Sequence, residues 1–384
     1  MHETIESKSE TVTLLRDAVA DFLEHEHSRE RLRDIDERRD ALSRDFWRQL
    51  AQQGWLALRW PESLDGAGLD VRTISVVAEQ WGRRVVPEPL VQCAVMPAVL
   101  AEHLADGAAK AAWAALAQAC ISGETLVAPA WQDTLQTLDA HTTARAEAAP
   151  GGWRLSARKY GVVGASIADA LLVTAQLEGM PALWLVPRNA KGLALHTNVG
   201  SDGGTVSVLH LDGVQLSAQA LLAHGKAVSQ ALEHAIDEAL LLLSAQLIGV
   251  ASAALDQTLD YMRLREQFGH RIGSFQAMQH AAVDARLQVT LARASLRSAL
   301  QRHAGTPSDD ATRAAIAAAK ARASDTALLC GRFAVQAHGA IGFAAESGVG
   351  QYLKSAIRLA ACLGNAGAQR ERHGRLTYLY EPVP

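Results

Sequence analysis

The sequence predicts an α+β protein that is mostly α, with an N-terminal helical domain, a central antiparallel β-barrel-like domain and a C-terminal four-helix bundle. Three observations support this fold class. Apolar residues recur at helical spacing up to about residue 125, short alternating runs follow, and long amphipathic segments resume near residue 224. With 384 residues the chain can hold two or three domains. We expect them at 1–125, 126–223 and 224–384.

The N-terminal region shows the helical period most clearly in "TVTLLRDAVADFLEHE". Val12, Leu15, Val19 and Phe22 recur there at the spacing of one helix face. The stretch "RWPESLDGAGLD" at 59–70 contains proline and glycines and is expected to be a loop.

The middle and C-terminal regions differ in period. "GGWRLSARKYGVV", "ADALLVTAQLEGMPALWLVP" and "TVSVLHLDGVQL" are alternating or β-rich runs next to turn residues, as in an antiparallel sheet or small barrel. The C-terminal region then predicts four long helices joined by short connections, which is typical of a helix bundle. Ser308 or Asp309 should cap the third helix. The predicted helices are 226–264, 275–304, 309–338 and 345–372.

Composition excludes several function classes. The net charge is −4 and the isoelectric point about 6.4, so we expect no nucleic-acid surface and no membrane-binding face. The four cysteines have no metal-ligand spacing and indicate a reducing compartment. The N-terminus lacks the apolar core of a signal peptide, and the apolar run 239–243 is too short to span a bilayer. We expect a soluble cytoplasmic protein.

Three motifs resemble those of the acyl-CoA dehydrogenase family. They are "YMRLREQFGHRIGSFQAMQH", "QAHGAIGFAAE" at 336–346 and the loop "PESLDGAGL". They occur in the family's order and at about its spacing, so the resemblance covers the whole chain. "YLKSAIRLAACLGNAG" and "VVPEPLV" look most like a bacterial branch with many members in steroid, aromatic or unusual acyl-CoA breakdown. Without the joint spacing, the same residues would read as ordinary solvated, capping or core residues.

The resemblance implies FAD, held between the β domain and the bundle and completed by a neighbouring subunit. A guanidinium at a helix end can neutralise a pyrophosphate with two hydrogen bonds, and glycines permit close backbone approach. Ala340 departs from the family's second glycine, which narrows this approach. The implied contacts are Arg265, Gln267, Phe268 and Gln276 to the partner's FAD, and Gln336, Gly339 and Ala340 to its adenine end.

The implied reaction needs a carboxylate base near the thioester. Most family members place it in a Glu-Gly-Thr motif, which here reads "CLGNAG", with Leu363 in place of the Glu. A minority use a Glu on the first bundle helix, at a position that falls on Ala239. Its neighbour Glu238, which follows Asp237, is our candidate base if the register shifts by one residue. The alternative is that both acids lie in the first turn of a helix and face water.

The β domain also departs from the family pattern. The segment that usually bonds flavin and substrate reads "VAPAWQDTLQTLDA", and the flavin-stacking segment reads "YGVVGASIADALLV". Ser166 is the hydroxyl nearest to the family's threonine. Trp131 is expected either near the flavin or in the core of the sheet.

Two functions follow from the resemblance. The first is an FAD-dependent acyl-CoA dehydrogenase, which introduces an α,β double bond by α-proton abstraction and hydride transfer to flavin N5. The second is a non-catalytic or half-site subunit of a heteromeric dehydrogenase, which completes the partner's FAD site. A third reading is a family fold without flavin. The expected partners are an acyl-CoA, an electron-transfer flavoprotein as acceptor, and like or unlike chains in a dimer or tetramer.

Overall fold

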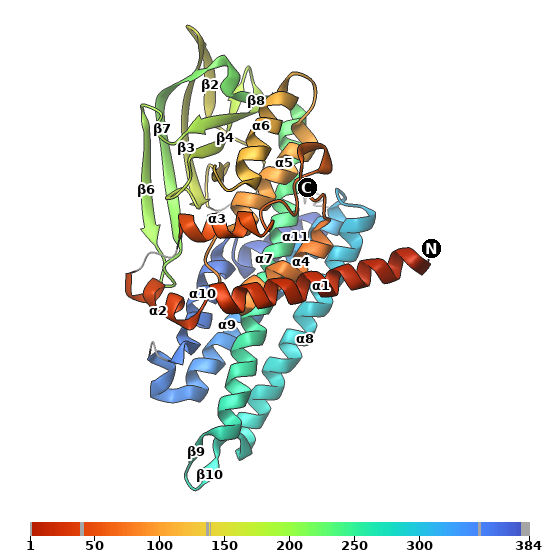
Figure 1. Ribbon diagram of the computed structural model, residues 1–384, viewed down its shortest axis with the longest axis vertical. Helices are drawn as coiled ribbons and strands as arrows, with labels where there is room; N and C mark the ends of the chain where they lie inside the picture. Colours follow the sequence, from red (N-terminus) through yellow and green to blue (C-terminus); the bar gives the residue numbers. More distant parts are fainter. Residues whose placement is uncertain (1, 39–41, 136–137, 139, 345–346, 378–384) are drawn as a thin grey trace, which may run out of the picture. The chain divides into compact units, whose positions relative to one another are not determined.

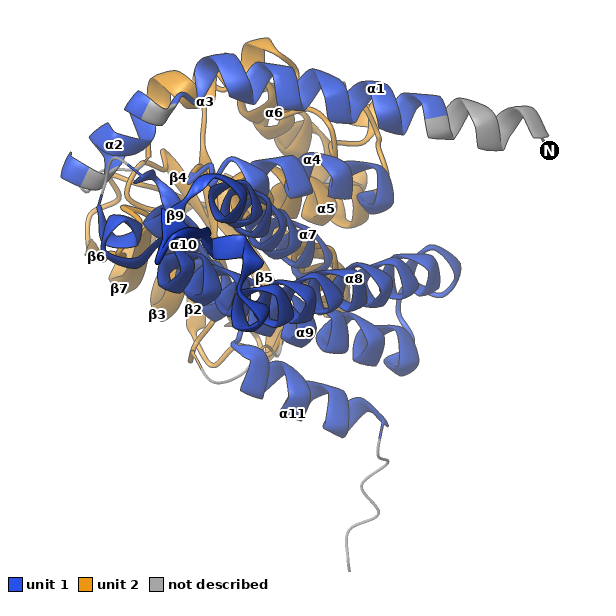
Figure 2. Ribbon diagram, turned by 90° about the horizontal axis from the view of Figure 1, so that it is seen from below, with its two compact units in different colours: residues 1–39, 71–87, 240–384 blue, residues 40–70, 88–239 orange. Residues whose placement is uncertain are grey.

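The computed structural model describes every residue except 1, 39–41, 136–137, 139, 345–346 and 378–384 (Figure 1). Helices extend to Ile121, strands run from Val127 to His224, and helices resume at Lys226, close to the predicted changes of texture. The chain forms two compact units whose segments alternate along the sequence (Figure 2). Unit 1 is 1–39, 71–87 and 240–384; unit 2 is 40–70 and 88–239. The three sequential domains stay a prediction.

The helices of unit 2 come from the N-terminal third of the chain. Ser43 begins the first of them by accepting a hydrogen bond from the Phe46 amide at 3.2 Å. The elements are α3 (Arg44–Gln52), η1 (Glu62–Leu64), the π turn η2 (Val91–Val95), α5 (Met96–Leu104), η3 (Gly107–Ala109), α6 (Lys110–Ile121) and the first part of α7 (Lys226–Leu264). Both η2 and α5 pack against the first strand of the sheet.

The eight-stranded sheet of unit 2 is open, with the order β6-β7-β3-β2-β4-β5-β8 and with β1 beside β4. Most neighbours are antiparallel, as predicted, but β1 and β2 both pair with β4 in parallel. The short 3-10 helix η4 (Ala218–Ala220) connects β7 to β8. The strands are β1 (Val127–Ala130), β2 (Arg145–Ala149), β3 (Gly152–Val163), β4 (Ala170–Leu177), β5 (Met180–Pro187), β6 (Leu193–Val199), β7 (Thr205–Ser217) and β8 (Leu221–His224).

Side-chain alternation sets which face of β3 is buried. Leu155, Ala157 and Lys159 point inward, while the residues between them are exposed. Two register shifts between β3 and β7 bend this pair. A charged residue on the inward face must find partners inside the sheet domain, because an isolated buried ammonium is costly.

Unit 1 contains the remaining helices. The predicted helix 345–372 is two helices, because the chain turns at 362–365; its residues 345–346 lie outside the described part of the chain. Asp309 caps α9 as predicted, since its side chain accepts the Thr312 amide at 2.6 Å. The elements are α1 (His2–Glu26), α2 (Arg29–Arg38), α4 (Val71–Arg83), the rest of α7, α8 (Gln276–Gly305), α9 (Asp310–His338), η6 (Gly339–Phe343), α10 (Val349–Ala361) and α11 (Ala366–Thr377).

Two glycines let α4 and α7 cross at backbone contact within unit 1. A Cβ on Gly82 would lie 1.9 Å from the carbonyl oxygen of Gln246, and a Cβ on Gly249 would lie 2.0 Å from that of Glu79. Any side chain at either position would force the two helices apart. This crossing fixes where α7 passes through the unit.

Within the described residues, α7 is the one helix long and apolar enough to cross a membrane by length and composition. Its most apolar stretch is wholly buried in the protein. That burial is typical of a central helix of a globular protein.

Candidate functional site

A short hairpin joins α7 to α8 and carries most of the predicted cofactor residues. Strands β9 (Glu266–Gln267) and β10 (His270–Arg271) pair in antiparallel fashion, and η5 (Ile272–Ser274) leads into α8. The turn residues Phe268 and Gly269 both have positive φ, +56° and +78°. A type I′ hairpin turn requires this at both central positions, and glycine supplies it freely while phenylalanine is strained.

The hairpin presents its side chains to solvent. Phe268 is 90% exposed and meets the edge of Phe275, with 6.4 Å between the ring centroids. The guanidinium of Arg265 is exposed and forms no ion pair with any described residue. Among the described residues, the Gln267 amide donates only to the carbonyl of Glu266, at 2.9 Å. The hairpin therefore exposes both an aromatic ring and a cation that has no ion-pair partner among the described residues.

Gln276 is the first residue of α8 and is also exposed. Gly273 has a different role from Gly269. A Cβ at Gly273 would lie 2.8 Å from the carbonyl oxygen of Met262, whereas a Cβ at Gly269 would meet nothing within 4 Å. Gly273 therefore serves helix packing inside the chain, and Gly269 serves the turn.

The second predicted segment lies at the end of α9. Gln336, Gly339 and Ala340 are exposed, and Gly339 has φ +62° and ψ −137°, a conformation that favours glycine. A Cβ on Gly339 would meet nothing within 4 Å, so its surface is open. Phe343, at the end of η6, is 85% exposed.

Stacking of two rings connects these segments within unit 1. His338, the last residue of α9, stacks on Tyr261 of α7, with 4.1 Å between the ring centroids and 19° between the ring planes. The backbone carbonyl of Tyr261 accepts a hydrogen bond from the backbone N–H of Arg265 at 2.8 Å. The structure therefore brings the two predicted cofactor segments together. Their exposed cation, aromatic rings and open glycine fit the pyrophosphate and adenine of an FAD.

The candidate base Glu238 lies in the fourth turn of α7, on the part of the helix that belongs to unit 2. Glu238 is 5% exposed and Asp237 is 1% exposed. The alternative of solvent-facing acids in a first helical turn is therefore wrong, because α7 begins at Lys226 and both side chains are buried. Ala239, where the family position falls, is fully buried as well.

Arg59 occupies both oxygens of the Glu238 carboxylate. Its Nε donates to Oε2 and its Nη2 donates to Oε1, each at 2.8 Å, and Nη2 also reaches Glu102 at 2.5 Å. Burial opposes the charge on Arg59, but the hydrogen bonds and attraction of Glu238, then of Glu102, raise its pKa. A base needs a free oxygen facing the proton that it removes. Glu238 stays a prediction as the base, and it would have to leave Arg59 to act.

The other base position is a turn held by a buried lysine. Leu363 is 8% exposed and adopts φ +50°, an uncommon conformation for a residue with a branched side chain. Lys320, which is fully buried, donates to the carbonyls of Ala360 at 3.2 Å and Gly364 at 3.4 Å. Gln369 donates to the Leu363 carbonyl at 2.6 Å. The turn is firmly fixed, but a leucine cannot remove a proton.

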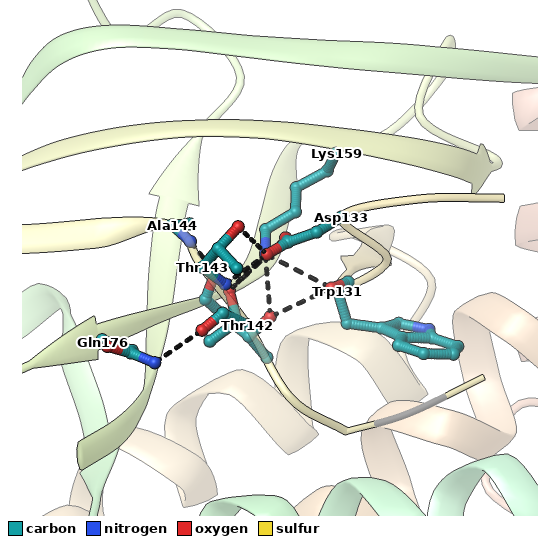
Figure 3. Close-up of polar contacts among 8 residues, drawn as sticks. Trp131, Asp133, Thr142, Thr143, Ala144, Lys159 and Gln176 are labelled. Carbon is teal, nitrogen blue, oxygen red and sulfur yellow. Dashed lines mark hydrogen bonds and ion pairs between the residues drawn. The ribbon is translucent and has the colours of Figure 1, made fainter. Parts of the chain in front are cut away.

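A second buried lysine organises the part of the sheet domain that departs from the family pattern (Figure 3). Lys159 forms an ion pair with Asp133 and donates to the Trp131 carbonyl at 3.2 Å and to Thr142 at 2.9 Å. Asp133 also accepts the backbone N–H of Thr143. Burial lowers the pKa of Lys159 to about 8, against the attraction of Asp133.

Two further predictions concern this domain. Trp131 is 4% exposed, so the structure places it in the interior. Ser166 shares a 2.8 Å hydrogen bond with Thr205, so its hydroxyl already has a partner inside the unit. The sequence analysis did not identify three buried cations that hold these regions together, Arg59, Lys159 and Lys320. The alternation of "LSARKYGVV" could have identified one of them, because it places Lys159 on the inward face.

Comparison with known proteins gives the same family for both ends of the chain. The profiles of the acyl-CoA dehydrogenase N-terminal and C-terminal domains match residues 9–124 and 228–376. Acyl-CoA dehydrogenase FadE27 of Mycobacterium tuberculosis is 27% identical over 351 residues, which is 90% of this chain and 91% of that protein. The chain belongs to the acyl-CoA dehydrogenase family, whose members are oxidoreductases acting on the CH–CH group.

Solved structures support the assignment over nearly the whole length. The ChsE4–ChsE5 complex from Mycobacterium tuberculosis has a TM-score of 0.83 at 26% identity, covering 95% of this chain and 96% of that chain. A variant of the Tcur3481–Tcur3483 steroid ACAD has a TM-score of 0.83 at 29% identity, covering 96% and 98%. This likeness accounts for the predicted order of helical, β and helical regions.

Proposed function

We propose that this chain is the half-site subunit of a heteromeric, FAD-dependent acyl-CoA dehydrogenase. It completes the FAD site of a partner chain through Arg265 and the exposed hairpin, and it leaves proton abstraction to that partner. The observation that carries the proposal is the state of the two base positions. Leu363 occupies one, and the acid nearest the other, Glu238, has both oxygens bonded to Arg59.

The residues that would hold FAD are those of the exposed clamp. Arg265 would pair with the pyrophosphate, Phe268 would pack on the adenine or ribose, and the amides of Gln267 and Gln276 would satisfy polar edges. Gln336, Gly339 and Ala340 would line the adenine end. FAD would supply the hydride acceptor for oxidation of an acyl thioester.

The relatives favour an assembly of two different chains. Both similar structures carry paired names, one of them described as a complex and the other as a steroid ACAD. We infer that the substrate is an acyl-CoA with a steroid or similarly bulky acyl group, that an electron-transfer flavoprotein is the acceptor, and that the assembly is cytoplasmic.

A second candidate keeps catalysis in this chain, with Glu238 as the base. Its burial on the first bundle helix favours this reading, because a proton-abstracting carboxylate acts in a site from which water is excluded. The two candidates differ in what the purified chain can do alone.

The test is to produce the chain alone and together with other acyl-CoA dehydrogenase chains of the same organism, each as a candidate partner. The proposal expects flavin absorbance and acyl-CoA bleaching only in the two-chain preparation. In that preparation, Glu238→Gln should leave the rate of bleaching unchanged. Bleaching by the single chain, lost on Glu238→Gln, would establish the second candidate instead.

A further inference from the structure

One face of α7 connects the two segments of the proposed clamp, through side chains that the proposed function does not use. Gln257 and Tyr261 lie four residues apart on α7, and Arg265 follows four residues later. Residues at this spacing share one face of a helix, about 6 Å apart along its axis. The backbone N–H of Arg265 still bonds to the carbonyl of Tyr261, so the cation of the clamp continues this face.

Tyr261 holds the place where the chain leaves α9. The ring of His338, the last residue of α9, stacks on the ring of Tyr261 and is only 6% exposed. Its Nδ1 donates to the carbonyl of Ala334 at 2.8 Å, which fixes the ring on its own helix. The next residue, Gly339, turns the chain away with φ +62° and ψ −137°. The position of His338 therefore sets where this glycine lies.

Gln257 holds the other end of the same connection, where the chain approaches α10. Its Nε2 donates to the carbonyl of Ser347 at 3.0 Å. The hydroxyl of Ser347 donates to the carbonyl of Ala344 at 2.9 Å and accepts the N–H of Val349 at 3.3 Å. Gln257 and Tyr261 therefore attach both ends of the α9–α10 connection to α7.

The connection is also pressed against α9 between these two attachments. A Cβ on Gly342, in η6, would lie 2.6 Å from the carbonyl oxygen of Val335. On α7, the hydroxyl of Tyr261 forms no hydrogen bond with any described residue. The contact with His338 is therefore made by the faces of the two rings, and a phenylalanine at position 261 can keep it.

We propose that Tyr261, His338 and Gln257 are positioning residues of the FAD clamp, an inference that rests on the proposed function. They hold Gly339 and its neighbour at a fixed spacing from Arg265, so that a nucleotide carried by the partner chain meets both ends of the clamp together. Contact groups that are already in place need not be ordered on binding, which strengthens affinity. The three side chains act through Arg265 and Gly339 and are assigned no contact with the FAD.

The first test needs no flavin and uses hydrogen exchange of the full-length chain, followed by mass spectrometry. Tyr261→Leu and His338→Ala should each speed the exchange of amides 339–344 roughly three- to tenfold, the value of one aromatic pair. Tyr261→Phe should exchange as the unaltered chain does. Gln257→Leu should speed exchange around Ser347 because the carbonyl of that residue loses its donor.

The second test measures the FAD affinity of the two-chain assembly by flavin absorbance after dialysis. Tyr261→Leu should weaken the affinity roughly three- to tenfold, and Tyr261→Phe should not. In an Arg265→Ala background, Tyr261→Leu should weaken it no further, because the cation that it positions is gone; a merely structural effect would add independently. The matched control is His103→Ala, which removes a stack of comparable geometry in unit 2, on His234 at 4.5 Å and 17°, and should leave the affinity unchanged.

Two results would overturn the positioning role. One is unaltered exchange of amides 339–344 in both Tyr261→Leu and His338→Ala. The other is an FAD affinity that Arg265→Ala weakens and Tyr261→Leu does not. An affinity that Arg265→Ala leaves unchanged would instead overturn the proposed function, and the positioning role with it. Gln257→Leu removes one hydrogen bond without emptying any space, so it keeps the exchange test decisive if Tyr261→Leu does not fold.

Discussion

Replacing Arg59 by methionine should be among the most damaging single changes in unit 2. Arg59 is 8% exposed, and its removal leaves the Glu238 carboxylate buried without its partner. Breaking a buried ion pair by removing one member costs about 3–5 kcal/mol. Glu102 adds little to this figure, because its side chain is 40% exposed and water can solvate it. We expect Arg59→Met to lower the free energy of unfolding by about 3–5 kcal/mol.

A double-mutant cycle isolates the pair from the packing of the arginine stem. Glu238→Gln alone leaves Arg59 with Glu102, so it should cost less than Arg59→Met. Arg59→Met combined with Glu238→Gln has no buried charge to leave unpaired, and it should recover much of the loss. The coupling energy should exceed about 2 kcal/mol, within the range for residues of one network.

Urea unfolding followed by tryptophan fluorescence suits this measurement, because Trp60 is fully buried next to Arg59. The midpoint should fall in Arg59→Met and rise again in the double variant, with similar slopes against urea concentration. A coupling energy below about 0.5 kcal/mol would refute the reasoning, since that is the additivity expected of independent sites. Glu238 would then be free of Arg59 and available as a base.

Three other predictions concern packing, titration and cofactor binding. Gly82→Ala should lower the free energy of unfolding by about 3 kcal/mol, because its Cβ would overpack the crossing of α4 and α7. The control Gly374→Ala on α11, where a Cβ meets nothing within 4 Å, should raise that free energy by about 0.5–1 kcal/mol. Equal effects of the two variants in urea titrations would contradict the helix crossing. Burial lowers the folded-state pKa of Lys159 from 10.5 to about 8, so between those pH values the unfolded chain holds a proton that the folded chain has lost. The free energy of unfolding should therefore rise with pH in this window, by up to about 3 kcal/mol relative to Lys159→Met. Parallel pH profiles of the two proteins would contradict this. Arg265→Ala should weaken the affinity of the assembly for FAD roughly ten- to a hundredfold, seen as a loss of flavin absorbance after dialysis. Unaltered flavin content would show that Arg265 does not contact the FAD.

The sequence was informative wherever the signal is local. The motif "REQFGHRIGSFQAMQH" predicts an exposed functional turn, and the structure gives a strained hairpin whose tip is open to solvent. The capping by Asp309 and the inward face of β3 follow from residue type and period alone. In each case a few neighbouring residues contain the whole physical reason.

Non-local pairings could not be predicted in this way. Arg59 and Glu238 lie 179 positions apart, and no period or spacing connects them. The break in the last predicted helix was also missed, because Leu363 fits a helical pattern and its left-handed backbone is fixed by Lys320 from another helix. The segments of the two compact units alternate along the chain, and texture along a sequence does not reveal that arrangement.

The central claim is that this chain completes a flavin site and relies on another chain for its base. The most direct measurement is native mass spectrometry of the chain made alone and with its partner, paired with the visible spectrum of each sample. The account predicts flavin only in complexes that contain both chains. Yellow homo-oligomers of this chain that are bleached by an acyl-CoA would contradict it.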